Sequence, residues 1–116
     1  MAGRSHILVV EDDPLVANVI LEALEETYAA SHASAVETAL ERVRECGIDL
    51  ILLDCSLVGG PADVLIQEAD RAGIPIILMS GDPGMADRLG GGRKFVLKPF
   101  TLSVLRGTIA ELVPPG

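Results

Sequence analysis

Short runs of apolar residues alternate along this chain with longer segments whose apolar residues recur at helical spacing. The run Leu50-Ile51-Leu52-Leu53 predicts a strand that is buried on both faces, because no polar residue interrupts it. Four of the runs, this one included, predict strands. They cover residues 6–10, 49–53, 74–79 and 94–97. A weaker strand is expected at residues 28–30. The pattern therefore predicts five strands separated by helices.

The first predicted helix has a clear start. Asp13 can cap it, and Pro14 suits its first turn, where a backbone N–H has no helical partner. The helix should end near Thr27. Its apolar stripe consists of Leu15, Val16, Val19, Ile20, Ala23 and Leu24.

Two more helices follow in the middle of the chain. Ser34 and Glu37 have the spacing of a capping box, which predicts the start of a second helix. Gly47 is its expected stop. A third helix should begin at Pro61 and run to Arg71.

The last third of the chain has less room for helices. Only residues 85–89 could be helical between the fourth and fifth strands, because glycine-rich turns flank them. Thr101 then predicts the cap of a final helix, which two prolines end. Its buried stripe is expected to consist of Leu102, Leu105, Ile109 and Leu112.

This order of elements predicts an α/β fold. Strands that alternate with helices form right-handed β-α-β units and a doubly wound parallel sheet. Five strands fit the flavodoxin-like order 2-1-3-4-5, in which the first and third strands are neighbours. The sequence shows no repeat, linker or low-complexity segment, so we expect a single domain over residues 1–116.

Residues with useful chemistry stand where the predicted strands end. Glu11 and Asp12 follow the first strand, Asp54 the third, Ser80 the fourth and Lys98 the fifth. In a parallel sheet these ends meet at one edge, where ligands bind. Three neighbouring carboxylates need a cation or a proton, and oxygen ligands of this kind suit Mg²⁺. A carboxylate can also act as a nucleophile and become an acyl phosphate, so the set indicates a metal-assisted phosphoryl acceptor.

Taken singly, these residues have ordinary structural explanations. An acid at a strand end is often a helix cap, as Asp13 is expected to be, and Ser80 could be a turn residue. The two histidines, His6 and His32, are expected to be solvated rather than catalytic. Only the combination of groups at four strand ends favours a functional interpretation.

Composition narrows the classes of partner. With 9 basic and 17 acidic residues the net charge is −8, which argues against nucleic acid as the main partner. Cys46 and Cys55 have no metal-site spacing and suit a reducing compartment. No apolar run approaches membrane length, and no signal peptide is recognisable. We therefore expect a cytoplasmic protein that uses neither nucleic acid nor membrane as a partner.

Four motifs together resemble the receiver domain of two-component response regulators. The resemblance spans Ile7 to about Leu112. The motifs are Leu-Val-Val-Glu-Asp-Asp-Pro at 8–14, Asp-Leu-Ile-Leu-Leu-Asp at 49–54, Ile-Ile-Leu-Met-Ser-Gly at 76–81 and Phe-Val-Leu-Lys-Pro-Phe at 95–100.

The resemblance implies a phosphorelay function. Asp54 would accept a phosphoryl group from a phosphohistidine on a sensor histidine kinase or a histidine phosphotransfer protein, and would lose it slowly by hydrolysis. Asp12 and Asp54 would bind Mg²⁺ directly, Glu11 through water, and Ser56 through its backbone carbonyl. A downstream protein target would read the phosphorylated state.

The resemblance also implies roles at the other strand ends. Lys98 would bind the phosphoryl oxygens, Ser80 would be the switch hydroxyl and Phe95 the switch aromatic residue. The chain departs from the usual pattern in having Glu11 where aspartate is commoner and a short segment between Ser80 and Lys98.

Two alternatives remain at this point. An interaction module that keeps the fold but signals without phosphate is supported by the short segment, whereas the intact set of Asp12, Asp54, Ser80 and Lys98 argues against it. A small hydrolase with Asp54 as nucleophile is disfavoured, because Ser56 stands where such an enzyme would carry its second acid. The expected form is a stand-alone receiver domain, although the chain could be excised from a longer protein.

Overall fold

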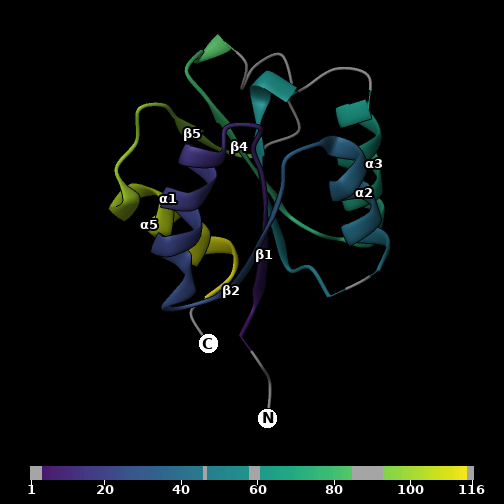
Figure 1. Cartoon of the computed structure of the whole chain (residues 1–116), viewed down its shortest axis with the longest axis horizontal. Helices are drawn as coiled ribbons and strands as arrows, with labels where there is room; N and C mark the ends of the chain where they lie inside the picture. The colour runs from purple at the N-terminus through teal and green to yellow at the C-terminus, as the bar shows by residue number, and fades with distance from the viewer. Residues whose placement is uncertain (1–3, 46, 58–60, 85–92, 115–116) are drawn as a thin grey trace.

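A computed structural model describes residues 4–45, 47–57, 61–84 and 93–114 of the chain (Figure 1). In this part of the chain, five parallel strands form one sheet in the order β2-β1-β3-β4-β5, which confirms the predicted order. The strands are β1 (His6–Val10), β2 (Ala29–Ala33), β3 (Leu50–Asp54), β4 (Ile76–Ser80) and β5 (Lys94–Leu97).

Helices cover both faces of the sheet. Helices α1 and α5 pack on one face, and α2 and α3 on the other (Figure 1). No helix in the described ranges is both long and apolar enough to cross a membrane. The bounds are α1 (Pro14–Glu25), α2 (Val36–Arg44), α3 (Pro61–Ala72) and α5 (Leu102–Leu112), with a 3₁₀ turn, η1 (Cys55–Leu57), after β3.

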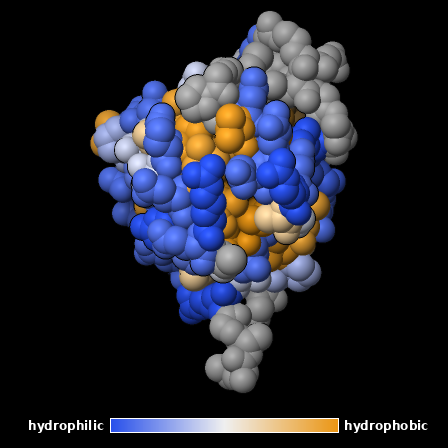
Figure 2. Space-filling view, turned by 90° about the vertical axis from the view of Figure 1, so that its right-hand side faces the viewer, coloured by the Kyte–Doolittle hydropathy of each residue, from blue (hydrophilic) through white to orange (hydrophobic). Residues whose placement is uncertain are grey.

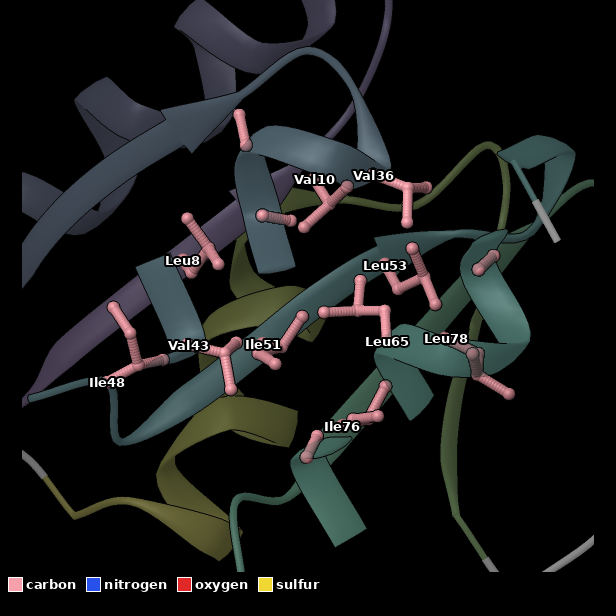
Figure 3. Packing of buried hydrophobic residues seen from close by; sticks show 14 of the residues in the cluster. Leu8, Val10, Val36, Val43, Ile48, Ile51, Leu53, Leu65, Ile76 and Leu78 are labelled. Atoms are coloured by element: carbon pink, nitrogen blue, oxygen red, sulfur yellow. The ribbon is translucent and has the colours of Figure 1, made fainter. Parts of the chain in front are cut away.

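The three central strands supply the core on both sides, because successive side chains of a strand point to opposite faces. Leu8 and Val10 of β1 and Ile51 and Leu53 of β3 point toward α2 and α3 (Figure 3). There they meet Leu65 of α3 and other aliphatic side chains. Viewed from outside, this side is mainly hydrophilic around a strip of apolar surface (Figure 2).

The opposite faces of the same strands form the second core. Here Leu50 and Leu52 of β3 pack with apolar residues of α1 and α5, including Ile20 and Ile109. An exception to the aliphatic packing is Tyr28, whose buried hydroxyl donates a hydrogen bond to the Val113 carbonyl at 2.7 Å. The core is therefore almost wholly aliphatic, as the low aromatic content predicts.

Helix starts were predicted with mixed success. Asp13 Oδ1 accepts a hydrogen bond from Leu15 N at 2.9 Å, and Thr101 Oγ1 accepts one from Val104 N at 3.1 Å, so both predicted caps are confirmed. The predicted capping box is wrong. Helix α2 begins at Val36 with Ala35 as its N-cap and has no side-chain cap hydrogen bond, so Ser34 lies one residue too early.

Some predicted boundaries were also wrong. Strand β2 runs from 29 to 33 because it pairs with β1 along its whole length, although its sequence is polar. Leu112, expected in the core, is 36% exposed, and Val113 is buried in its place where α5 ends. Strands β3 and β4 reach one residue further than predicted and end on Asp54 and Ser80. The helix expected at 85–89 lies outside the described residues.

Candidate functional site

The predicted site residues meet at the carboxyl edge, the end of the sheet where the strands terminate, at the top of Figure 1. β3 lies between β1 and β4, so Asp54 has the β1 acids on one side and Ser80 on the other. Glu11, Asp12 and Asp54 each have a carboxylate oxygen within 4.8 Å of the others. The strand order alone therefore brings residues more than 40 positions apart into one cluster.

Lys98 provides a positive charge beside these carboxylates. Its Nζ lies 3.2 Å from Asp54 Oδ2 and 3.3 Å from Glu11 Oε1. The Glu11 side chain is only 1% exposed, whereas that of Lys98 is 30% exposed. One ammonium group cannot neutralise three carboxylates, so the cluster keeps a negative charge unless a proton or a cation binds.

The pKa values reflect this crowding. Burial, reinforced by a hydrogen bond with Asp54, raises the pKa of Glu11 from 4.5 to about 7. Burial also opposes ionisation of Asp54, but hydrogen bonds from Glu11, the Ser56 amide and Lys98 outweigh it and lower the pKa of Asp54. The pKa of Lys98 is raised, because its contacts with Asp54 and Glu11 outweigh burial. Without a metal ion and below about pH 7, Glu11 therefore holds a proton beside an ionised Asp54.

The turn after β3 orients Asp54. The Ser56 backbone N–H donates to Asp54 Oδ1 at 2.9 Å, while Oδ2 faces Lys98. Cys55, between them, is buried, and burial together with the Asp54 charge raises the pKa of its thiol to about 11. Cys55 thus stays protonated and is a poor nucleophile.

An open cavity adjoins Asp54. It has a volume of about 320 Å³ and is lined by Asp54, Cys55, Ser56, Ser80, Gly81, Asp82 and Lys98. Ser80 Oγ accepts a hydrogen bond from the Asp82 backbone N–H at 3.0 Å, which leaves the hydroxyl proton available to a ligand. Phe95 lies outside the cavity and is partly buried against the core on the α2/α3 side.

The donor set fits a hard divalent cation. Three oxygen ligands converge, one of them a buried glutamate whose pKa is raised by its burial and by the neighbouring Asp54. Mg²⁺ favours such carboxylate ligands together with water and phosphate. Asp12, Asp54 and Glu11 are thus the residues that could hold Mg²⁺.

A second, larger cavity of about 620 Å³ lies between α1 and the segment that joins β5 to α5. Leu15 and Val19, predicted to belong to the apolar stripe of α1, are 76% and 52% exposed at this cavity. Lys98 lines both cavities, so the apolar groove adjoins the carboxylate cluster. Its lining consists of Leu15, Val16, Val19, Ile20, Lys98, Pro99, Phe100 and Leu102.

A contact between His32 and the backbone of Glu11 could not be predicted from the sequence. His6 and His32 were expected to be solvated, but both are partly buried and hydrogen-bonded. His32 Nε2 lies 2.7 Å from the backbone carbonyl oxygen of Glu11, and His6 Nε2 lies 2.8 Å from Ser31 Oγ. The place of His32 next to the acidic pair follows only from the pairing of β2 with β1.

Comparison with known proteins agrees with this geometry. The family model of the response regulator receiver domain matches residues 7–110. The DNA-binding response regulator MtrA of Mycolicibacterium smegmatis is 35% identical over 103 residues, which cover 84% of this chain and 45% of MtrA. The chain spans about half the length of the curated relatives it matches.

Solved structures are similar over nearly the whole chain. The receiver domain of a Pseudomonas aeruginosa sensor histidine kinase, with a magnesium ion in its active-site cleft, is 25% identical with a TM-score of 0.80, covering 96% of this chain and 98% of that one. A receiver protein from Burkholderia phymatum has a TM-score of 0.84 at 20% identity, covering 97% and 98%. Fold, strand-end residues and family match agree, and the chain belongs to the response regulator receiver domain family.

Proposed function

We propose that this receiver domain accepts a phosphoryl group on Asp54 from a phosphohistidine of a partner protein. In this step the phosphorus–nitrogen bond of the donor breaks and a bond forms between phosphorus and a carboxylate oxygen of Asp54. The observation that carries the proposal is the setting of Asp54, an ionised carboxylate 3.2 Å from Lys98 Nζ and beside an open cavity of about 320 Å³. Slow hydrolysis of the acyl phosphate would reset the protein.

The acidic cluster is the proposed Mg²⁺ site. Asp12 and Asp54 would bind the ion directly, Glu11 through a water molecule and Ser56 through its backbone carbonyl. The convergence of the three carboxylates and the raised pKa of Glu11 support this assignment. When bound, the ion would offset the charge of the incoming phosphoryl group, which carries about −2.

Two other residues are proposed to contact the phosphoryl group. Lys98 would bind one of its oxygens, since its ammonium already faces Asp54. Ser80 would donate its hydroxyl proton, since its oxygen already accepts from Asp82 N. Phe95 of β5 pairs with Leu78, two residues before Ser80, and would change position with these residues as the switch aromatic residue.

The groove beside α1 is the proposed docking surface for the phosphodonor. An apolar helix face of a histidine kinase or histidine phosphotransfer protein would bind in this groove, because Lys98 lines both the groove and the cavity beside Asp54. A helix seated there would bring its histidine close to Asp54. The downstream target is proposed to be a cytoplasmic protein rather than nucleic acid, given a net charge of −8.

Intact-mass measurement with a small phosphodonor tests the proposal. The protein is incubated with acetyl phosphate and Mg²⁺, and in parallel with a chelator. We expect the mass of one phosphoryl group with Mg²⁺ and little or none in chelator. A folded protein that gains no phosphoryl group under either condition would instead be an interaction module that works without phosphate.

A further inference from the structure

Both backbone groups of Glu11, its N–H and its carbonyl, bind residues of β2, although β1 ends one residue earlier. Its N–H donates to the Ala33 carbonyl at 3.1 Å, and its carbonyl lies 2.7 Å from His32 Nε2. Glu11 is therefore held as an extension of the β1–β2 ladder, immediately before the chain turns into Asp12 and α1.

The imidazole of His32 takes the place of a missing backbone donor. In a parallel ladder, the residue that donates to Ala33 would next accept from the N–H of Ala35. Strand β2 ends at Ala33, however, and Ala35 already serves as the N-cap of α2. The Glu11 carbonyl receives the His32 side chain instead. A carbonyl can only accept, so His32 must carry its proton on Nε2.

The position of His32 makes this contact possible. His32 pairs in register with Val9, which points toward the α1/α5 side of the sheet. Glu11, two residues further along the same chain, follows the same alternation. His32 therefore lies on the α1/α5 side of the sheet, and its contact with the Glu11 carbonyl directs the partly buried ring toward the carboxyl edge.

We propose that His32 is a positioning residue for the acidic pair: its Nε2–H fixes the Glu11 carbonyl and so sets where the Glu11 and Asp12 carboxylates lie for Mg²⁺ binding. The inference rests on the proposed function, since it concerns the ion that assists phosphorylation. Glu11 is buried, and Asp12 follows it directly in the chain. A change in the plane of the Glu11 peptide would therefore move both carboxylates.

The chain supplies a matched control in its other histidine. His6 is also partly buried, and its Nε2 makes a hydrogen bond of similar length, 2.8 Å, to Ser31 Oγ. His6 lies at the opposite end of the ladder from Glu11, and its partner Ser31 pairs with Leu8 in the middle of the ladder. Loss of the His6 ring should therefore affect the packing of β1 and β2 without moving the Glu11 and Asp12 carboxylates.

Calorimetric Mg²⁺ titration of the whole chain, with a circular-dichroism melt of each variant, tests the proposal. His32→Phe keeps the ring volume but removes the donor, and we expect Mg²⁺ to bind it about fivefold to tenfold more weakly. His32→Gln places an amide N–H near the position of Nε2 and should bind Mg²⁺ within about twofold of the original protein. His6→Phe should also stay within about twofold.

A measurement without metal keeps the inference testable on its own. We expect proton–nitrogen NMR to show the Nε2–H tautomer of His32, and His32→Phe to speed exchange of the Glu11 and Asp13 amides more than His6→Phe does. Equal Mg²⁺ affinity of His32→Phe and the original protein, or equal losses in His6→Phe and His32→Phe, would overturn the role of His32. Failure of the original protein to bind Mg²⁺ would overturn the metal site itself, which is a separate result.

Discussion

The interior of the sheet and its carboxyl edge are built from consecutive residues of the same strands, yet they obey opposite rules. In β3, residues Leu50 to Leu53 are fully buried among aliphatic side chains, and the next residue, Asp54, is a buried carboxylate among other charges. The interior gains free energy from every residue, whereas the edge brings together like charges that repel. A single step along the strand thus leads from the packed core to the proposed site.

The charges at the carboxyl edge are partly compensated, and its buried polar groups are hydrogen-bonded. Lys98 and a proton on Glu11 compensate part of the negative charge. No side-chain nitrogen or oxygen that is buried in the described part of the chain lacks a hydrogen-bond partner. Residues kept for chemistry commonly lower stability, and the comparison predicts that substitutions in the two regions will have different signatures.

A substitution inside the sheet should have the largest effect on stability. Leu52→Ala removes a fully buried side chain of β3 that packs against α1 and α5. It should lower the free energy of unfolding by about 3 to 5 kcal/mol. Leu52→Met keeps most of the volume and should cost less than about 1.5 kcal/mol. Urea denaturation measures both. Similar losses for the two variants would mean that packing does not dominate here.

The second effect is a pH dependence that comes from Glu11. Its pKa is raised in the folded state, so its contribution to stability is complete below about pH 4.5 and is lost as the pH rises to about 7. In chelator, this loss should amount to about 2 to 3 kcal/mol. Asp54, whose pKa is lowered, acts in the opposite sense, and its contribution is lost only as the pH falls below its ordinary value of 3.8.

Glu11→Gln isolates this contribution, because glutamine does not titrate. Urea denaturation of both proteins at pH 5 and pH 8, without metal, should show a smaller drop for the variant. An equal drop in the two proteins would place the titrating group elsewhere.

Loss of the Lys98 charge should have an intermediate effect. Lys98→Met leaves Asp54 and Glu11 without their counter-charge and should destabilise the metal-free protein by about 1 to 2 kcal/mol at neutral pH. Lys94→Met is the matched control, since its ion pair with Glu111 is exposed on both sides and should contribute less than about 0.5 kcal/mol. Thermal melts in chelator compare the two. Equal shifts of the melting temperature would show that the Lys98 charge stabilises the protein no more than an exposed ion pair does.

The smallest effect on stability is expected in the groove. Leu15 is 76% exposed, so Leu15→Ser should change the free energy of unfolding by less than about 0.5 kcal/mol. It should nevertheless slow phosphorylation by a phosphohistidine protein while leaving phosphorylation by acetyl phosphate unchanged. Val64→Thr, on α3 across the sheet, is the control and should slow neither reaction. Equal rates for Leu15→Ser and the original protein with the protein donor would remove the groove from the docking surface.

The strands and their order could be predicted because apolar runs and chain spacing determine them. The strand ends then located Asp54, Ser80 and Lys98 without further information. Local signals failed where tertiary contacts compete with them. Pairing with β1 extends β2 through Ser31 and His32, and the same pairing starts α2 later than the Ser34 capping pattern indicated.

Side-chain contacts between strands could not be predicted from the sequence. The bond from His32 to Glu11 depends on the register of two strands that are separated by 18 residues, those between Val10 and Ala29. Likewise, helical spacing places Leu15 and Val19 on an apolar stripe but does not say that α5 leaves them uncovered. Periodicity reveals which side of a helix is apolar, and only packing decides what covers it.

We expect Asp54 alone, among the clustered acids, to accept the phosphoryl group. Borohydride converts an aspartyl phosphate to homoserine, and trypsin places Asp54 in the peptide 45–71 and Glu11, Asp12 and Asp13 in the peptide 5–42. After treatment with acetyl phosphate and Mg²⁺, peptide mass spectrometry should find homoserine at position 54 and unmodified acids in the other peptide. Homoserine at position 12 or 13, with an unmodified residue 54, would show that another carboxylate accepts the phosphoryl group.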